Sequence, residues 1–218
     1  MSLYEKLQYR LVNGFYSAGQ RLKTTALAEA YETSASTMRE TLFRLSTVGL
    51  VEFEEQRGFR MPQISTKAQR ELTLMRILLE SEGACRSIEN GGVAWGARLT
   101  AAHHKLSHIE GLVRAGQRDS EILVIWTDAE LEFHRTLIDA CGLELLMDTH
   151  LIVYNRFRQQ MINSDQNFTY VPENITQHKR IVEAALAGDP QLTRARISEH
   201  LIRNADGVRT AEVSAPSP

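Results

Sequence analysis

The amino-acid sequence predicts a mainly α-helical protein built from two parts of unequal size. The first 62 residues combine short helical repeats with one alternating stretch that is typical of a β-hairpin. From about residue 66 onward the apolar residues keep helical spacing, which indicates an all-α bundle of about six helices. A chain of 218 residues is long enough to bury a core in each part.

The composition is that of an ordinary globular protein. Hydrophobic residues make up 43% of the chain and charged residues 24%, and the formal net charge of −2 excludes a generic polyanion binder. Cys85 and Cys141 lack metal or redox spacing, which favours reduced thiols. The N-terminus has no secretory pattern, and the longest apolar run, Ile122–Trp126, is too short to span a bilayer. We therefore expect a soluble, cytoplasmic protein with no membrane contact.

Residues 1–62 carry the pattern of a winged helix-turn-helix. Apolar spacing predicts helices over Ser2–Asn13, from about Thr24 to Tyr31, and from Ser34 up to Gly49. The last two are joined by a short turn, and the second opens with small polar residues, as in helix-turn-helix motifs. The alternating stretch that follows predicts a hairpin, the wing, with Arg57 at its tip.

This geometry predicts contact with double-stranded operator DNA, because the second helix of the motif enters the major groove. Eight basic residues against seven acidic ones over residues 1–62 support this only weakly. A small winged domain used for protein contacts therefore remains the alternative. The predicted DNA-binding residues are Arg21, Ser34, Ser36, Thr37, Arg39, Arg44, Arg57 and Gly58.

Residues 5–62 resemble the winged helix-turn-helix of the GntR family of bacterial transcription regulators. The motifs that carry the resemblance are Gly14, Gly19–Leu22, Ser34, Met38–Leu42, Leu45, Gly49–Val51 and Arg57–Gly58. Ala18 replaces the loop proline of the family, and Ala35 replaces the arginine that commonly follows the first serine of the recognition helix. The resemblance implies DNA binding, while the operator sequence of other members does not carry over.

The second part begins after a linker, residues 63–66, and the domain spans residues 67–210, followed by a tail, residues 211–218. Breaks at glycine, proline and asparagine divide it into six predicted helices. Their expected bounds are Thr66–Asn90, Val93–Ala115, Ser120–Ala140, Leu143–Ile162, Pro172–Ala187 and Pro190–Thr210.

Three of these helices each carry one histidine within an apolar repeat: His134, His178 and His200. Glu130 lies one turn before His134 on the same face. If these side chains converge, they make a nitrogen and oxygen site that suits zinc, nickel, iron or manganese better than calcium. Spacing alone does not establish convergence, so separate structural histidines remain the alternative. The other four, His103, His104, His108 and His150, are expected mostly at the surface.

Residues from about Leu72 to Ala205 resemble the all-helical FCD effector domain of the FadR-like branch of the same family. The matching motifs are Glu130–Leu137, His178–Asp189 and His200–Leu201. The resemblance implies a divalent metal held by Glu130, His134, His178 and His200, with zinc first and nickel or manganese as alternatives. Glu130 stands where the family usually has aspartate. A small organic acid would bind at the metal, with Arg76, Arg156 and Asn204 as effector-binding candidates.

The sequence thus predicts a metabolite-responsive transcription regulator, expected to act as a homodimer and a repressor, and not as an enzyme. A helical metalloenzyme with a small accessory domain is the alternative. The sequence offers it no general base at a defined spacing and no nucleophile constellation. A third reading keeps the effector but assigns the histidines a structural role without metal.

Overall fold

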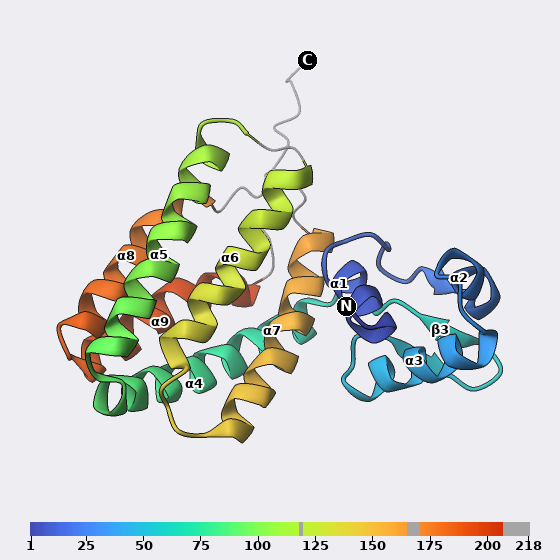
Figure 1. Cartoon of the computed structure of the whole chain (residues 1–218), viewed down its shortest axis with the longest axis horizontal. Coiled ribbons are helices and arrows are strands. Elements are labelled where there is room, and N and C mark those ends of the chain that lie inside the picture. The colour runs from blue at the N-terminus through green and yellow to red at the C-terminus, as the bar shows by residue number, and fades with distance from the viewer. Residues whose placement is uncertain (118–119, 165–170, 207–218) are drawn as a thin grey trace, which may run out of the picture.

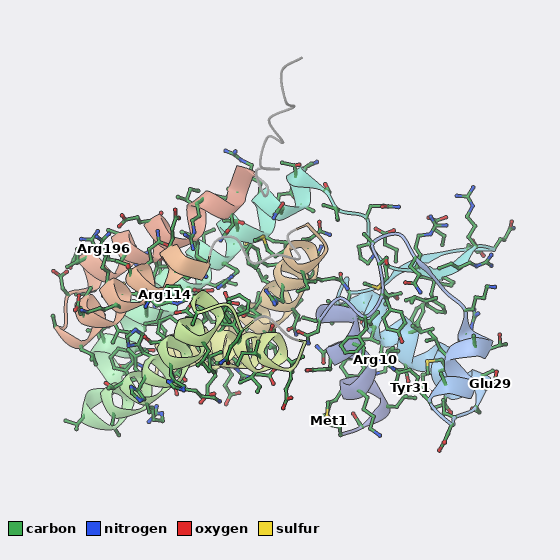
Figure 2. All side chains as sticks on the ribbon, turned by 90° about the horizontal axis from the view of Figure 1, so that it is seen from above. Met1, Arg10, Glu29, Tyr31, Arg114 and Arg196 are labelled. Carbon is green, nitrogen blue, oxygen red and sulfur yellow. The ribbon has the colours of Figure 1, made fainter. Side chains whose placement is uncertain are left out.

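The computed structural model describes residues 1–117, 120–164 and 171–206, and it confirms the mainly α-helical prediction. Figure 1 shows a small N-terminal unit beside a larger bundle of long helices. Figure 2 shows the same two units from above, with Arg10, Glu29 and Tyr31 on the smaller one and Arg114 and Arg196 on the bundle. None of the helices in the described ranges has the length and apolar character needed to cross a membrane.

The N-terminal unit is a three-helix motif with a three-stranded antiparallel sheet in the order β1-β3-β2. Ser2 and Glu5 form a capping box that starts the first helix, and Ser34 Oγ caps the third by accepting from the Thr37 amide at 3.0 Å. The sequence did not predict the first strand, because two residues are too short to show alternation. The elements are α1 (Leu3–Val12), β1 (Arg21–Leu22), α2 (Thr24–Ala30), α3 (Ala35–Thr47), β2 (Glu52–Glu54) and β3 (Gly58–Arg60).

The bundle follows in six helices whose observed bounds lie close to the predicted ones. The predicted last helix is too long: α9 ends at Ile202 and a 3-10 turn continues to Asp206, while residues 207–218 lie outside the described part. The elements are α4 (Thr66–Asn90), α5 (Gly92–Arg114), α6 (Ser120–Ile138), α7 (Glu144–Ser164), α8 (Val171–Leu186), α9 (Pro190–Ile202) and η1 (Arg203–Asp206). The long helix α4 packs against α6, α7 and α9 and so borders the centre of the bundle.

Helix α7 connects the two units through a pair of neighbouring glutamines. Gln159 Nε2 donates to the carbonyl oxygen of Leu11 at 3.3 Å and to that of Leu50 at 3.0 Å, both in the N-terminal unit. Gln160 holds the linker, because its Nε2 donates to the Gln63 carbonyl and its Oε1 accepts from the Ser65 amide, each at 2.9 Å. The placement of the N-terminal unit therefore depends on α7.

Candidate metal and effector site

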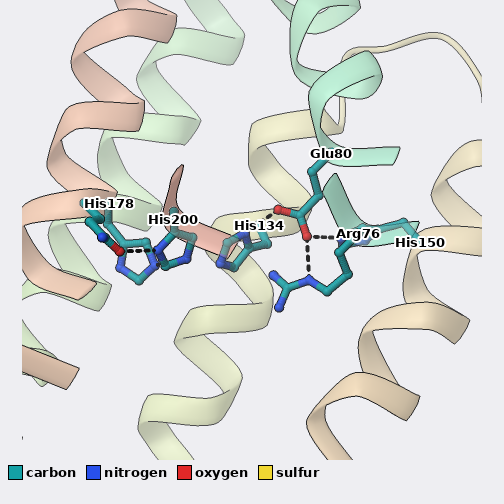
Figure 3. Close-up of polar contacts among 7 residues, drawn as sticks. Arg76, Glu80, His134, His150, His178 and His200 are labelled. Carbon is teal, nitrogen blue, oxygen red and sulfur yellow. Dashed lines mark hydrogen bonds and ion pairs between the residues drawn. The ribbon is translucent and has the colours of Figure 1, made fainter. Parts of the chain in front are cut away.

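Three histidines from three different helices converge in the centre of the bundle. His134 on α6, His178 on α8 and His200 on α9 are buried, and each offers a ring nitrogen within 4.8 Å of the other two. The Nε2 atoms of His178 and His200 are 3.2 Å apart. Figure 3 shows the two rings next to each other, with His134 beside His200. The structure thus brings together residues that lie 66 positions apart in the sequence.

The outer nitrogen of each ring faces an acceptor on another side chain. His134 Nδ1 lies 2.8 Å from Glu80 Oε2, and His200 Nδ1 lies 3.0 Å from Gln177 Oε1. His178 Nδ1 lies 3.1 Å from Glu110 Oε1, a close contact whose angle does not make it a hydrogen bond. A carboxylate or amide oxygen only accepts, so the Nδ1 atoms of His134 and His200 carry the hydrogen. Their Nε2 atoms then direct lone pairs toward the centre, which is the arrangement of metal-ligating histidines.

The protonation behaviour of these histidines fits the same arrangement. Burial lowers the pKa of His134 and holds that of His200 well below its usual range, and in each case neighbouring His178 adds to the effect. A neutral imidazole is the form that binds a metal ion. His134 Nε2 is buried without a hydrogen-bond partner in the described part of the chain.

Glu80 is the central residue of the site that the sequence did not predict. It is fully buried on α4, where its Oε1 accepts from Arg76 Nε at 2.7 Å and lies 3.0 Å from His150 Nε2. Burial alone would raise the pKa of Glu80, but the Arg76 charge and the histidine contacts outweigh it and hold that pKa well below its usual range. The expectation that His150 lies at the surface is wrong, because its ring is fully buried beside Glu80.

The other predicted surface histidines follow the expectation more closely. His104 and His108 on α5 are exposed. His103 is half-buried with its ring near Phe133, and burial lowers its pKa.

A small cavity adjoins the histidine cluster. Its volume, counted as the space open to the centre of a water-sized sphere, is about 10 Å³, which is room for about one water molecule. The guanidinium of Arg76 is buried between the rings of Tyr154 and Phe157, at 4.7 and 4.6 Å from their centroids, and its Nη2 has no hydrogen-bond partner among the described residues. The cavity is lined by Arg76, Glu130, Phe157, Arg158, Met161, Asn174, His200, Leu201 and Asn204.

Glu130, Arg76 and Asn204 line this cavity, whereas Arg156 lies in a separate groove. Glu130 is buried and lines the cavity, but it lies outside the group of three histidines whose ligand atoms meet. Arg76 and Asn204 also line the cavity. The structure places Arg156 elsewhere: it is exposed in a groove between the two units, with its guanidinium against Gly49. Arg158 takes its place, because residues two apart on a helix face nearly opposite sides.

The predicted DNA-binding residues form the outer surface of the N-terminal unit. Arg39 is exposed on α3 with its guanidinium 5.9 Å from the Phe53 ring, and Arg44 lies 4.8 Å from the ring of Tyr4. Arg57 at the tip of the wing forms an ion pair with Glu54 at 3.1 Å. The other predicted contacts are exposed or, for Gly58, half-buried: Arg21, Ser34, Ser36, Thr37 and Gly58.

Comparison with known proteins supplies a family for each unit. Residues 1–61 match the bacterial regulatory proteins of the gntR family, and residues 71–203 match the FCD domain. The chain is 30% identical over 209 residues to the HTH-type transcriptional regulator BphR of Paraburkholderia xenovorans, covering 94% of this chain and 83% of that protein. It is 22% identical to the HTH-type transcriptional repressor GlaR of Escherichia coli, covering 91% of this chain and 90% of that protein.

Solved structures share the fold of this chain. The structure of E. coli McbR/YncC has a TM-score of 0.76 and 21% identity, with 92% of each chain covered. A GntR transcriptional regulator from Rhodococcus sp. RHA1 has a TM-score of 0.74 and 18% identity, with 93% of each chain covered. At these identities the likeness shows the fold.

Proposed function

Because the chain belongs to the GntR family of bacterial regulatory proteins and carries an FCD domain, we propose that it regulates transcription in response to a small carboxylate metabolite bound at a divalent metal ion. The observation that carries the metal part of the proposal is the geometry of the three buried histidines. Each directs one ring nitrogen toward a common point, while its other nitrogen faces an acceptor. When bound, the metal supplies a positive centre with open positions for a carboxylate oxygen.

The ligand set favours zinc, with nickel and manganese as alternatives. Three neutral imidazoles suit zinc and nickel, and a carboxylate nearby also suits manganese. Glu130 lies in the adjoining cavity and is the proposed oxygen ligand, reaching the metal by a change of side-chain rotamer.

The balance of buried charge supports a cation together with one anion. Among the residues that the structure describes, and with every group counted as charged, the buried carboxylates of Glu80, Glu110 and Glu130 exceed the buried guanidinium groups of Arg76 and Arg158 by one negative charge. A divalent cation reverses this to one positive charge, and a bound monocarboxylate then neutralises it. Because uncompensated buried charge is costly, this balance favours a small acid with a single carboxylate.

Arg76 is the proposed anchor for that carboxylate. Its Nη2 is buried at the cavity without a partner in the described residues, while its Nε is held by Glu80. A guanidinium fixed in this way presents a donor whose direction does not change when the ligand arrives. Asn204 and Arg158 line the same cavity and add further donors.

Helix α7 is the proposed path from the effector to the DNA. The rings of Tyr154 and Phe157 on this helix pack against Arg76, and Arg158 lines the cavity. The next two residues, Gln159 and Gln160, hold the N-terminal unit and the linker. A ligand that shifts α7 would therefore change the placement of the recognition helix. We propose that operator binding is repressive and is relieved by the effector, in line with the name of the repressor GlaR.

The bundle also supports the proposed homodimer. Three apolar side chains on the outer face of α4 are exposed: Leu74 by 41%, Met75 by 40% and Leu78 by 62%. Such a stripe on a long helix fits burial against a second copy of the chain. In the dimer, two recognition helices would enter successive major grooves about 34–36 Å apart.

The DNA part of the proposal is tested with Arg39→Ala and an operator selected from a random DNA pool by the wild-type protein. We expect Arg39→Ala to lose about 1–3 kcal/mol of operator binding and to show a shallower salt dependence. Arg114→Ala, a change at an exposed position on α5, is the matched control and should bind as the wild type does. Equal affinity and salt slope for Arg39→Ala would refute the assignment of the recognition helix.

The effector part is tested by releasing that operator with a panel of small mono- and dicarboxylates, with zinc and with a chelator. Release by monocarboxylates that disappears with the chelator supports the proposal, and release that survives chelation supports the metal-free alternative. The named relatives are transcriptional regulators, which favours a regulator over a metalloenzyme. Turnover of a bound acid by the zinc-loaded protein would reverse this preference.

A further inference from the structure

Glu80 contacts side chains from three helices at one point in the bundle. The carboxylate comes from α4, His134 from α6 and His150 from α7, and Arg76 lies one turn before it on α4. Figure 3 shows Glu80 between the histidine cluster on one side and Arg76 and His150 on the other. Because all four side chains are buried, solvent does not replace any of these contacts.

The two oxygens of this carboxylate have different partners. Oε1 faces Arg76 Nε at 2.7 Å and His150 Nε2 at 3.0 Å, and Oε2 faces His134 Nδ1 at 2.8 Å. The contacts at Oε1 therefore fix the direction of Oε2. A hydrogen bond to Oε2 requires the hydrogen of His134 on Nδ1, which leaves Nε2 as an acceptor facing His178 and His200.

Glu110 offers a comparison within the same site. Its Oε1 lies 3.1 Å from His178 Nδ1, but neither of its oxygens has a hydrogen-bond partner in the described part of the chain. No arginine orients this carboxylate as Arg76 orients Glu80 in the described structure. Glu110 is thus equally buried and lies 0.3 Å farther from its histidine, without the second anchor.

We propose that Glu80 is a positioning residue of the metal site, which selects the His134 tautomer able to bind a metal through Nε2. The inference rests on the proposed metal site, although Glu80 itself does not face the point where the histidines meet. Under this proposal the Arg76–Glu80 ion pair of α4 orients His134 in addition to stabilising the bundle.

The Glu80→Gln variant tests this because an amide has only one accepting oxygen. The charged Arg76 donor takes that oxygen, so the amide NH₂ turns toward His134. His134 then accepts through Nδ1 and carries its hydrogen on Nε2, which blocks the metal-binding lone pair. Long-range ¹H–¹⁵N spectra of histidine-labelled, chelator-treated protein report the tautomer. We expect hydrogen on Nδ1 of His134 in the wild type and on Nε2 in Glu80→Gln.

Zinc affinity, measured by competition with a chromogenic chelator, is the second readout. We expect Glu80→Gln to weaken the zinc Kd by about 10–100-fold, the usual effect of losing a group that orients a metal-bound histidine. The matched variant Glu110→Gln should weaken it less than about threefold, because Glu110 makes no aligned hydrogen bond. Equal losses in the two variants would show a general effect of negative charge and overturn the positioning role.

A double variant keeps the test valid if Glu80→Gln does not fold. Arg76→Met combined with Glu80→Met removes both charges, leaves no unpaired ion and deprives His134 Nδ1 of its acceptor. We expect the same loss of zinc affinity, and wild-type affinity in this folded variant would overturn the proposal. If the wild type binds no zinc, the proposed metal site fails, while the His134 tautomer still decides whether Glu80 acts as described.

Discussion

The two units of this protein have cores of opposite character. In the N-terminal unit, Leu7, Leu42 and Phe59 belong to a core of apolar side chains, and Thr41 is its one buried polar residue. In the bundle, the apolar core surrounds charged groups such as Arg76 and Glu80 that are less than 2% exposed. The first core serves folding, and the residues predicted to contact DNA lie outside it. The second core holds both the fold and the proposed ligand site, so changes to one should affect the other.

The largest change in stability is expected from Arg76→Met in the core of the bundle. The variant leaves Glu80 buried without its arginine, which should destabilise the bundle by about 3–5 kcal/mol in chemical denaturation. Arg86→Met is the control on the same helix, because Arg86 pairs with Glu82 at the same distance of 2.7 Å but is 44% exposed. It should cost less than about 1 kcal/mol. Similar losses of stability in the two variants would mean that the buried ion pair contributes no more to stability than the exposed one.

A loss of about 2–5 kcal/mol is expected from Leu42→Ala in the apolar core, through the lost burial and the cavity left behind. Operator binding should fall with the folded fraction of the N-terminal unit, while zinc binding stays as in the wild type. Circular dichroism, operator titration and zinc competition on one preparation check this. Zinc binding that falls together with operator binding would show that the two cores do not act separately.

An intermediate effect is expected from Gln159→Leu at the contact between the units. Two carbonyl oxygens, those of Leu11 and Leu50, lose their donor, at a cost of about 1–3 kcal/mol to docking. Small-angle X-ray scattering should show a larger radius of gyration, with unchanged helix content. Gln191→Leu, at an exposed position, is the control. An unchanged radius for Gln159→Leu would contradict the role assigned to α7.

The smallest effect is a difference in pH dependence between the units. The pKa values of His134 and His200 are lowered in the native state, so the unfolded chain binds more protons below about pH 6.5. Their contribution to the stability of the chelator-treated bundle is complete above that pH and is lost as the pH falls toward the native pKa values. The N-terminal unit contains no histidine and should lack this dependence. If the free energy of unfolding of the bundle increased as the pH was lowered from 7 to 5, the lowered pKa values assigned to His134 and His200 would be contradicted.

The contrast between the cores also explains what the sequence could predict. Helix positions followed from apolar spacing, and the recognition helix and wing followed from local turn and capping signals at Ser34 and Gly58. On α4 apolar spacing alone does not identify the buried face, because Leu74 and Leu78 are exposed while Arg76 and Glu80 are buried. The ion pair spaced four residues apart was the only local signal for this inversion.

Whether the three histidines meet depends on how the helices pack, and the sequence pattern did not show which side chains would face them. The three histidines were identified from their apolar repeats, but the acceptors that face their outer nitrogens, Glu80, Glu110 and Gln177, lie on other helices, α4, α5 and α8. Arg156 was predicted at the site, and the cavity is lined by Arg158 instead, because the rotation of α7 about its axis is determined only by packing against the neighbouring helices.

The most direct test of a ligand site within the bundle core is elemental analysis of purified wild-type protein and of His134→Ala, without added metal. The account predicts about one divalent ion per chain in the wild type and its loss in His134→Ala, with folding checked by circular dichroism. No ion in either protein, even after soaking with zinc, nickel and manganese, would contradict the metal centre and leave the three histidines as a structural cluster.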